Sequence, residues 1–232
     1  VRASAALPQR LKAAWPAFES VHYVTGMGGD ENKGKKIVQQ VLDAGFLINM
    51  AVMKSHGDGP TLCAKNHYGT VDGQRHGPLY GNSGYYSNLV ELMGHKDLGE
   101  KTVLFLIDTI YGSSGPNNVP SKWAKEPFNG DWPSSVLLSQ DGVAIDSVGF
   151  DFLNAEFGQP QNTDYHLHDA AYIPGTDGKK LSGVAYAPNV GSTATIGSLG
   201  VHEHWNSATD RKYTRNLGTG SGIELVALST AP

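Results

Sequence analysis

An apolar run at residues 46–52 constrains the fold of this chain more than any other feature. It follows residues 35–44, whose apolar side chains recur at helical spacing, and Gly45 between the two segments is typical of a helix end. The run itself is typical of a buried strand. A helix followed at once by a buried strand indicates a sheet with helices packed against it.

Further segments repeat this alternation of helices and strands. Helical spacing predicts a helical turn at residues 62–67 and helices at residues 85–95 and 142–157. Short apolar runs predict strands at residues 103–107, 135–138 and 223–228, whereas residues 158–200 show little periodicity. We therefore expect one α/β domain over residues 1–232, with a mixed or mostly parallel sheet flanked by helices and with long Gly/Pro-rich loops.

Composition excludes several classes of protein. With 39% hydrophobic and 17% charged residues, the chain is globular rather than disordered. The net charge of −4 argues against nucleic acid as a partner, and no apolar run is long enough to span a membrane. The single cysteine, Cys63, excludes an iron–sulfur cluster held by cysteines of this chain alone. We interpret Cys63 as a packing residue rather than a nucleophile.

Polar and titratable side chains crowd the segment that follows the first strand, at residues 54–76. Such groups at the end of a buried strand are where α/β proteins place their sites. We predict that His56, His67 and His76 bind a metal and that Lys54 and Lys65 stabilise negative charge in catalysis. The alternative is that these side chains are solvated or cap loops.

A second candidate lies near the carboxyl end of the chain, where His202 and His204 flank Glu203. On an extended segment the two imidazoles point to the same side, which suits two ligands of a divalent transition metal, while Glu203 faces away. The alternative is a hydrogen-bonded or stacked histidine pair beside Trp205. His166 and His168 have the same spacing in a polar stretch, and we interpret residues 166–169 as surface residues.

Acidic and basic side chains complete the candidate site. We expect Asp108 to end a strand and to act as a base or orient a ligand, and Asp146 to have a capping or pairing role within a helix. Arg211, Arg215 and Asn216 precede or begin a glycine-rich stretch and can bind a phosphate or carboxylate, or merely balance local acids. Two further residues join the predicted ligand-binding set, namely Asn66 and Tyr68.

Several ordered blocks resemble the domain of unknown function 362 family. They are residues 48–56, residues 64–69 with His76, residues 106–112 with the Gly115–Pro116 step, residues 139–146, residues 199–206 and residues 213–218. Together they cover most of residues 44–228, and the closing blocks are similar to an exported bacterial subgroup. The resemblance therefore implies an extracytoplasmic protein, either periplasmic or secreted.

The resemblance also sets two expectations about what accompanies this chain. Family members are often fused to ferredoxin-like iron–sulfur modules, but one cysteine is too few, so no iron–sulfur cluster is expected here. Members usually carry another α/β segment before the first block, and residues 1–45 are too short for all of it. We expect the chain to be the carboxyl-terminal part of a longer protein, with an N-terminal partner segment.

Three classes of function remain open at this point, because the family has no settled activity. The first is a metal- or anion-dependent enzyme with a Lys/His/Asp site at the carboxyl ends of the strands, acting on an unknown small molecule. The second is an extracytoplasmic binding protein for an anionic or sugar-like ligand, without catalysis. The third is a scaffold in which the polar blocks only order long loops. We rank the enzyme first.

Overall fold

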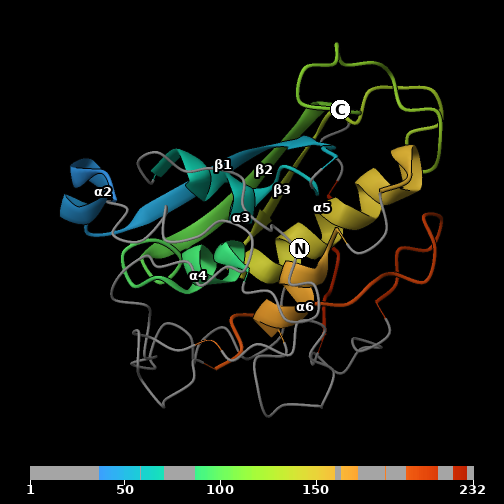
Figure 1. The fold of residues 1–232 in the computed structure, drawn as a ribbon. Coiled ribbons are helices and arrows are strands. Elements are labelled where there is room, and N and C mark those ends of the chain that lie inside the picture. Colours follow the sequence, from blue (N-terminus) through green and yellow to red (C-terminus); the bar gives the residue numbers. More distant parts are fainter. Residues whose placement is uncertain are drawn as a thin grey trace.

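A three-stranded mixed sheet forms the centre of the structure (Figure 1). The computed structural model describes residues 37–57, 59–70, 87–159, 163–171, 186, 197–213 and 222–228. Strand β1 (Leu47–Lys54) pairs in parallel with β2 (Thr102–Ser113), and β2 pairs antiparallel with β3 (Ser135–Ser139). With helices beside the sheet, this arrangement confirms the predicted α/β class.

The helices of the described residues are short, apart from one long helix that packs across the sheet. In chain order they are α2 (Gln39–Asp43), α3 (Cys63–Asn66) with a 3-10 turn (His67–Thr70), α4 (Asn88–Gly94), α5 (Gly142–Phe157) and α6 (Tyr165–Ala171). Figure 1 shows α4, α5 and α6 together on one side of the sheet. No helix among the described residues is long and apolar enough to cross a lipid bilayer.

Side-chain alternation gives the sheet one buried face and one open face. In β1, Ala51 and Met53 are buried, while Ile48, Met50 and Val52 between them are exposed. The buried side chains share a core cluster with Ile107 of β2 and with Ala144, Ile145 and Val148 of α5. Helices α3 and α5 therefore cover the same face of the sheet.

Two predicted strands differ from the observed ones, and one helix was not predicted. Strand β2 continues past Asp108 to Ser113, so Asp108 lies within a strand and does not end it. Residues 223–228 form no strand beyond an isolated bridge at Glu224, and the N–H of the buried Ile223 donates to the Glu203 carboxylate. Helix α6 lies in the stretch where no periodicity was visible.

A buried carboxylate joins α5 to the amino-terminal end of α3. The two oxygens of Asp146 accept hydrogen bonds from the backbone N–H groups of Cys63 and Ala64, each at 2.8 Å. These are among the first N–H groups of a helix, which lack partners within the helix itself. The structural role predicted for Asp146 is confirmed. Cys63 is also buried, and burial raises its thiol pKa well above the usual value, which confirms its packing role.

Asp146 makes stability depend on pH in a defined direction. Burial raises its pKa to about 7, although the two N–H groups oppose the shift. In the unfolded chain the Asp146 carboxyl titrates near pH 4, because it is solvated there. As pH rises from about 4 to about 7, the unfolded state is therefore stabilised by ionisation while the folded state is not, and the fold becomes less stable. The Asp146→Asn variant lacks this titration and serves as the reference. We expect the difference in free energy of unfolding, native chain minus variant, to fall by on the order of 3 kcal/mol over this pH range. Urea denaturation at several pH values measures it, and a flat or rising difference contradicts the expectation.

Candidate metal centre

Helix α6 and residues 199–206 bring four potential metal ligands together. Asp164 immediately precedes α6, and His168 lies one helical turn later, so both side chains face the same side. His202 and His204 approach them from the extended carboxyl-terminal segment. One ligand atom from each of the four residues lies within 4.8 Å of all the others.

The Asp164 carboxylate is the centre of this group. Its Oδ2 lies 3.2 Å from Nε2 of His168, 3.5 Å from Nε2 of His202 and 3.2 Å from Nε2 of His204. Neighbouring ligand atoms on a tetrahedral ion with bonds of about 2.1 Å lie about 3.4 Å apart, so these three separations fit a shared ion. The widest separation in the group, up to 4.8 Å, requires the imidazoles to close in slightly on binding.

Helix α5 fixes the orientation of His202. The Ser147 hydroxyl donates its single proton to the carbonyl of Val143 at 2.7 Å, and its oxygen lies 2.8 Å from Nδ1 of His202. Ser147 therefore accepts a hydrogen bond from Nδ1–H, which places the proton of neutral His202 on that nitrogen. The Nε2 lone pair of His202 then faces the Asp164 carboxylate.

The next turn of α5 orients His204 through a buried carboxylate. Oδ1 of Asp151 lies 2.7 Å from Nδ1 of His204, and its Oδ2 accepts hydrogen bonds from the Trp205 N–H and the Tyr213 hydroxyl. A metal-binding histidine typically donates its second ring N–H to such a carboxylate or hydroxyl. Ser147 and Asp151, four residues apart, thus hold both imidazoles with Nε2 directed toward Asp164.

The electrostatics of the group favour a cation. Burial lowers the pKa of His202 to about 4, so its ring is neutral at pH 7. The hydrogen bond with Asp151, followed by that with Asp164, raises the pKa of His204 to about 10. Burial alone would raise the pKa of Asp164, but the hydrogen bonds with His168 and His204 bring it well below its usual range. The Nε2 lone pair of His202 and the ionised carboxylate of Asp164 repel each other unless a cation lies between them.

Exposure differs across the group and leaves one side open. The side chain of His202 is 1% exposed, whereas that of His204 is 42% exposed. Asp164 and His168 lie between these extremes. A small molecule can therefore approach the four residues from the His204 side, while the His202 side is closed by the core.

Asp141 positions the segment that carries the two histidines. It caps the start of α5 by accepting hydrogen bonds from the N–H groups of Val143 and Ala144, each at 2.9 Å. Its other oxygen accepts a hydrogen bond from the N–H of Val201 at 3.0 Å, next to His202. The helix cap and the histidine segment are thus held by one carboxylate.

The sequence identified half of this group. His202 and His204 lie together with ring centroids 4.8 Å apart, as their spacing predicts, and Glu203 is directed instead to Ile223. The surface interpretation of residues 166–169 is wrong, because His166 and Asp169 are buried and His168 is one of the four potential metal ligands, which we call the metal group. Asp164 was not predicted, although an aspartate four residues before a histidine at a helix start was a usable signal.

The residues predicted after β1 have a different setting. His67 is buried, its Nε2 lies 3.1 Å from Nδ2 of Asn49, and burial, followed by the charge of His95, lowers its pKa to about 4. Asn66 donates hydrogen bonds to Oδ1 of Asn49 and to the carbonyl of Met50. These bonds tie α3 to β1. Neither His67 nor His56 belongs to the group of four ligands.

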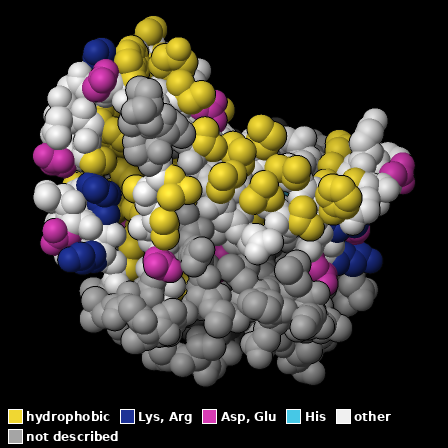
Figure 2. All heavy atoms as spheres, turned by 180° about the vertical axis from the view of Figure 1, so that it is seen from behind, with side chains coloured by type: hydrophobic (Ala, Val, Ile, Leu, Met, Phe, Trp, Pro, Cys, Tyr) yellow, Lys and Arg dark blue, Asp and Glu magenta, His cyan; other side chains and the backbone are white. Residues whose placement is uncertain are grey.

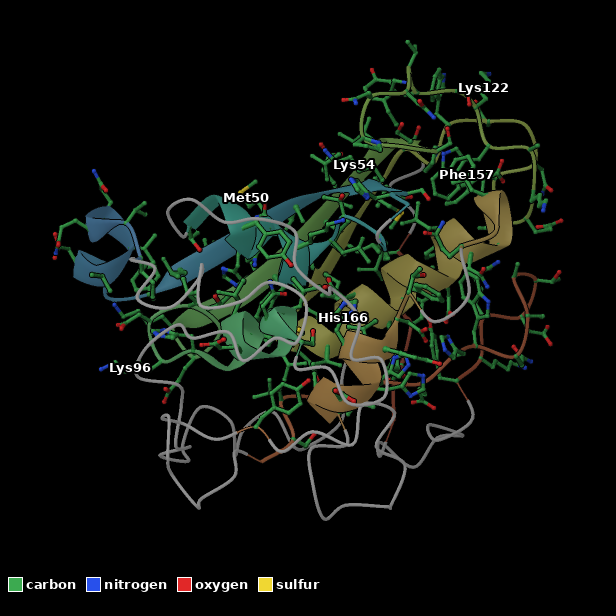
Figure 3. All side chains as sticks on the ribbon, viewed as in Figure 1. Met50, Lys54, Lys96, Lys122, Phe157 and His166 are labelled. Carbon is green, nitrogen blue, oxygen red and sulfur yellow. The ribbon has the colours of Figure 1, made fainter. Side chains whose placement is uncertain are left out.

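The remaining predicted residues are spread over the molecule. Lys65 is buried and donates to the carbonyl of Gly59 at 3.2 Å, and the Tyr68 hydroxyl donates to Asn88. Arg211 donates to the carbonyl of Ala208 in its own turn. Figure 3 shows Lys54 at the far end of β1, away from His166 on α6. His76, Arg215 and Asn216 lie outside the described residues.

Asp108 points away from the metal group. It lies between Ile107 and Thr109, which are buried against the helices, so its side chain is on the opposite face of the sheet. Its Oδ1 accepts a hydrogen bond from the N–H of Ile110 at 2.9 Å.

Comparison with known proteins places the chain in a family. No curated protein and no solved structure matches it significantly. The family model described as "Domain of unknown function (DUF362)" matches residues 5–151, so the match ends at the carboxylate that orients His204, and the four ligands lie beyond it. Because the match covers more than half of the sequence, the chain belongs to the DUF362 family.

Proposed function

We propose that this chain is a metal-dependent enzyme whose divalent transition-metal ion is held by Asp164, His168, His202 and His204. The observation that carries the proposal is the convergence of three Nε2 atoms on one carboxylate oxygen, with the Nε2 of His202 deprotonated by its bond to Ser147. A bound ion would attract both the Nε2 lone pair of His202 and the Asp164 carboxylate, which otherwise repel each other.

The donor set narrows the kind of ion and its chemistry. Three imidazoles and one carboxylate suit a first-row ion such as Zn²⁺ or Fe²⁺ better than Ca²⁺ or Mg²⁺, which prefer oxygen ligands. Such an ion acts as a Lewis acid that polarises a carbonyl or phosphoryl oxygen and makes bound water more acidic. The carboxylate of Asp164 compensates the ion's charge, and Asp151 and Ser147 keep the imidazoles in position.

The open side of the group supports catalysis over a purely structural ion. Structural zinc sites are closed by their protein ligands, whereas catalytic sites keep one position accessible. The four side chains proposed here fill a tetrahedral ion, so a catalytic ion would have to take its substrate as a fifth ligand, from the side where His168 and His204 are partly exposed. The pKa of His166 on α6 is lowered mainly by burial, with a smaller contribution from the buried ammonium of Lys65 on α3, which we propose adds positive charge for an anionic substrate. Lys54 and Asp108 have no part in this proposal.

Elemental analysis of the native chain, purified without chelators, tests the proposal directly. We expect about one transition-metal ion per chain, and a loss of roughly 5–10 °C in Tm after chelation that is restored by stoichiometric ion. The loaded protein is then incubated with phosphate-ester, carboxylic-ester and amide substrates, where ion-dependent product is expected. A native chain that lacks metal and whose Tm responds neither to chelation nor to added Zn²⁺ or Fe²⁺ contradicts the proposal. Ion-dependent ligand binding without product would make the chain a binding protein instead.

A further inference from the structure

The face of the sheet opposite α5 is an ordered array of aliphatic side chains. The strand registers arrange them in three rows: Ile48 beside Leu104; Met50 beside Leu106 and Leu138; Val52 beside Asp108 and Val136. We call these eight residues the bare sheet face. Ile48, Met50, Val52, Val136 and Leu138 are each about half exposed or more. Figure 2, which views the molecule from behind, shows hydrophobic side chains gathered in a band over this part of the surface.

Such a face is unusual for strands of this kind. Parallel strands of α/β proteins are normally buried on both faces, which is why they read as continuous apolar runs. In β1 that apolar character is present on both faces, but α3 and α5 pack only against the side of Ala51 and Met53. The largest apolar patch on a typical soluble monomer covers about 300–600 Å² and is often functional.

We propose that the bare sheet face is the interface of a symmetric homodimer. A two-fold axis needs only one self-complementary patch, and a flat array of branched side chains on three registered strands is self-complementary. Two such sheets pack about 10 Å apart, with their strands within about 30° of each other, so that the rows of one copy interdigitate with those of the other.

The area and charge of the bare sheet face fit a second copy of this chain. The seven aliphatic side chains offer on the order of 400 Å² of apolar surface. Two copies would bury about 800 Å² of apolar surface, and a polar rim of about 400 Å² would bring the total to about 1,200 Å², the lower limit of specific interfaces. An interface of this size predicts a reversible dimer with a Kd in the micromolar range. The only charged member is Asp108, so the face lacks the charge pattern that would select a highly charged partner.

Asp108 is compatible with this packing because of its place in the array. It lies in the last of the three rows, and its carboxylate already accepts the N–H of Ile110. A two-fold axis through the central row, which contains Met50 and Leu106, leaves Asp108 toward the rim of the interface. There water can continue to solvate the carboxylate.

Met50 provides a native reporter of what covers this face. It is 63% exposed, whereas Met53 and Met93 are buried and serve as internal references. The chain is prepared at two protein concentrations, about 1 μM and about 300 μM, and each sample receives the same brief pulse of hydrogen peroxide. Sulfoxide at each methionine is then measured by peptide mass spectrometry. We expect Met50 oxidation to be roughly 10-fold slower at the higher concentration, where sedimentation gives the mass of a dimer.

Two other results overturn the proposal. Fast oxidation of Met50 at both concentrations means that the face stays bare. Slow oxidation at both concentrations, in a chain that sediments as a monomer, means that another part of the same chain covers it.

Charge insertion provides an independent check. Leu138→Glu places a carboxylate in the central row and is expected to raise the dimer Kd at least 100-fold. Val119→Glu is the matched control, because Val119 is 88% exposed and lies outside the bare sheet face. If Leu138→Glu leaves dimerisation unchanged in a folded protein, the bare sheet face is not the interface.

Discussion

Replacing His202 by alanine is expected to lower the affinity of the chain for Zn²⁺ by roughly 1,000-fold or more. The substitution removes one of the four proposed ligand atoms, so only Asp164, His168 and His204 remain to hold the ion. The loss should exceed the 10–100-fold typical of an outer-shell change, such as loss of the Asp151 contact to His204. Competition with a coloured chelator, performed on metal-free protein, measures the dissociation constant.

The matched control is His56→Ala, which removes an imidazole outside the group. It should change the Zn²⁺ affinity by less than about twofold, within the range of a remote surface substitution. Asp164→Asn adds a second test, because it removes the charge at the centre with little change in shape. If His56→Ala loses Zn²⁺ binding while His202→Ala and Asp164→Asn keep it, the metal site lies in the segment after β1 instead.

The two halves of the metal group differ in how far they could be predicted from the sequence. His202 and His204 are predictable, because residues two apart on an extended segment share a side whatever the rest of the fold does. Asp164 and His168 meet them only through the packing of α6 against α5 and residues 199–206. The spacing of these two residues indicates one side of a helix start, but nothing in the local sequence shows that this helix packs beside residues 199–206.

The segment after β1 shows why titratable side chains are an ambiguous signal. Asn66 and His67 follow a buried strand, as functional groups in α/β proteins do, yet their described bonds are to Asn49 and the backbone of β1. A polar side chain that hydrogen-bonds a helix to a strand has the same sequence context as one that binds a ligand. Only the geometry separates the two roles.

The fold itself was predictable where local chemistry agrees with tertiary packing. Helix α5 has the predicted bounds, because Asp141 caps its first turn and Gly158, at a φ of +67°, ends it. The end of β2 was misplaced because Asp108 interrupts an apolar run. A charged residue on the open face of a sheet does not end a strand, since its backbone still pairs with Val136 of β3.

The contact between Gly200 and Asp141 links the stability of this fold to the metal group. A Cβ atom at Gly200 would collide with the Asp141 carboxylate, with Cγ only 2.7 Å and Oδ2 only 2.8 Å away. The carboxylate cannot move aside without losing the N–H groups of Val143, Ala144 and Val201. Those bonds cap α5 and hold the segment that carries His202. A shift of either Asp141 or Gly200 that relieves the collision therefore disturbs both the helix cap and this segment.

Gly200→Ala is therefore expected to lower the free energy of unfolding by roughly 3 kcal/mol or more, through overpacking and the loss of buried hydrogen bonds. Because residues 199–206 must shift, the Zn²⁺ affinity of the remaining folded protein should fall as well. Urea denaturation and chelator competition measure the two effects. Gly197→Ala is the matched control, because a Cβ at Gly197 meets nothing within 4 Å, and it should stay within about 0.5 kcal/mol of the native chain. If the two variants are equally stable, the Asp141 carboxylate is not the rigid anchor of the histidine segment. The geometry that directs His202 and His204 toward Asp164 must then be held by Ser147 and Asp151 alone.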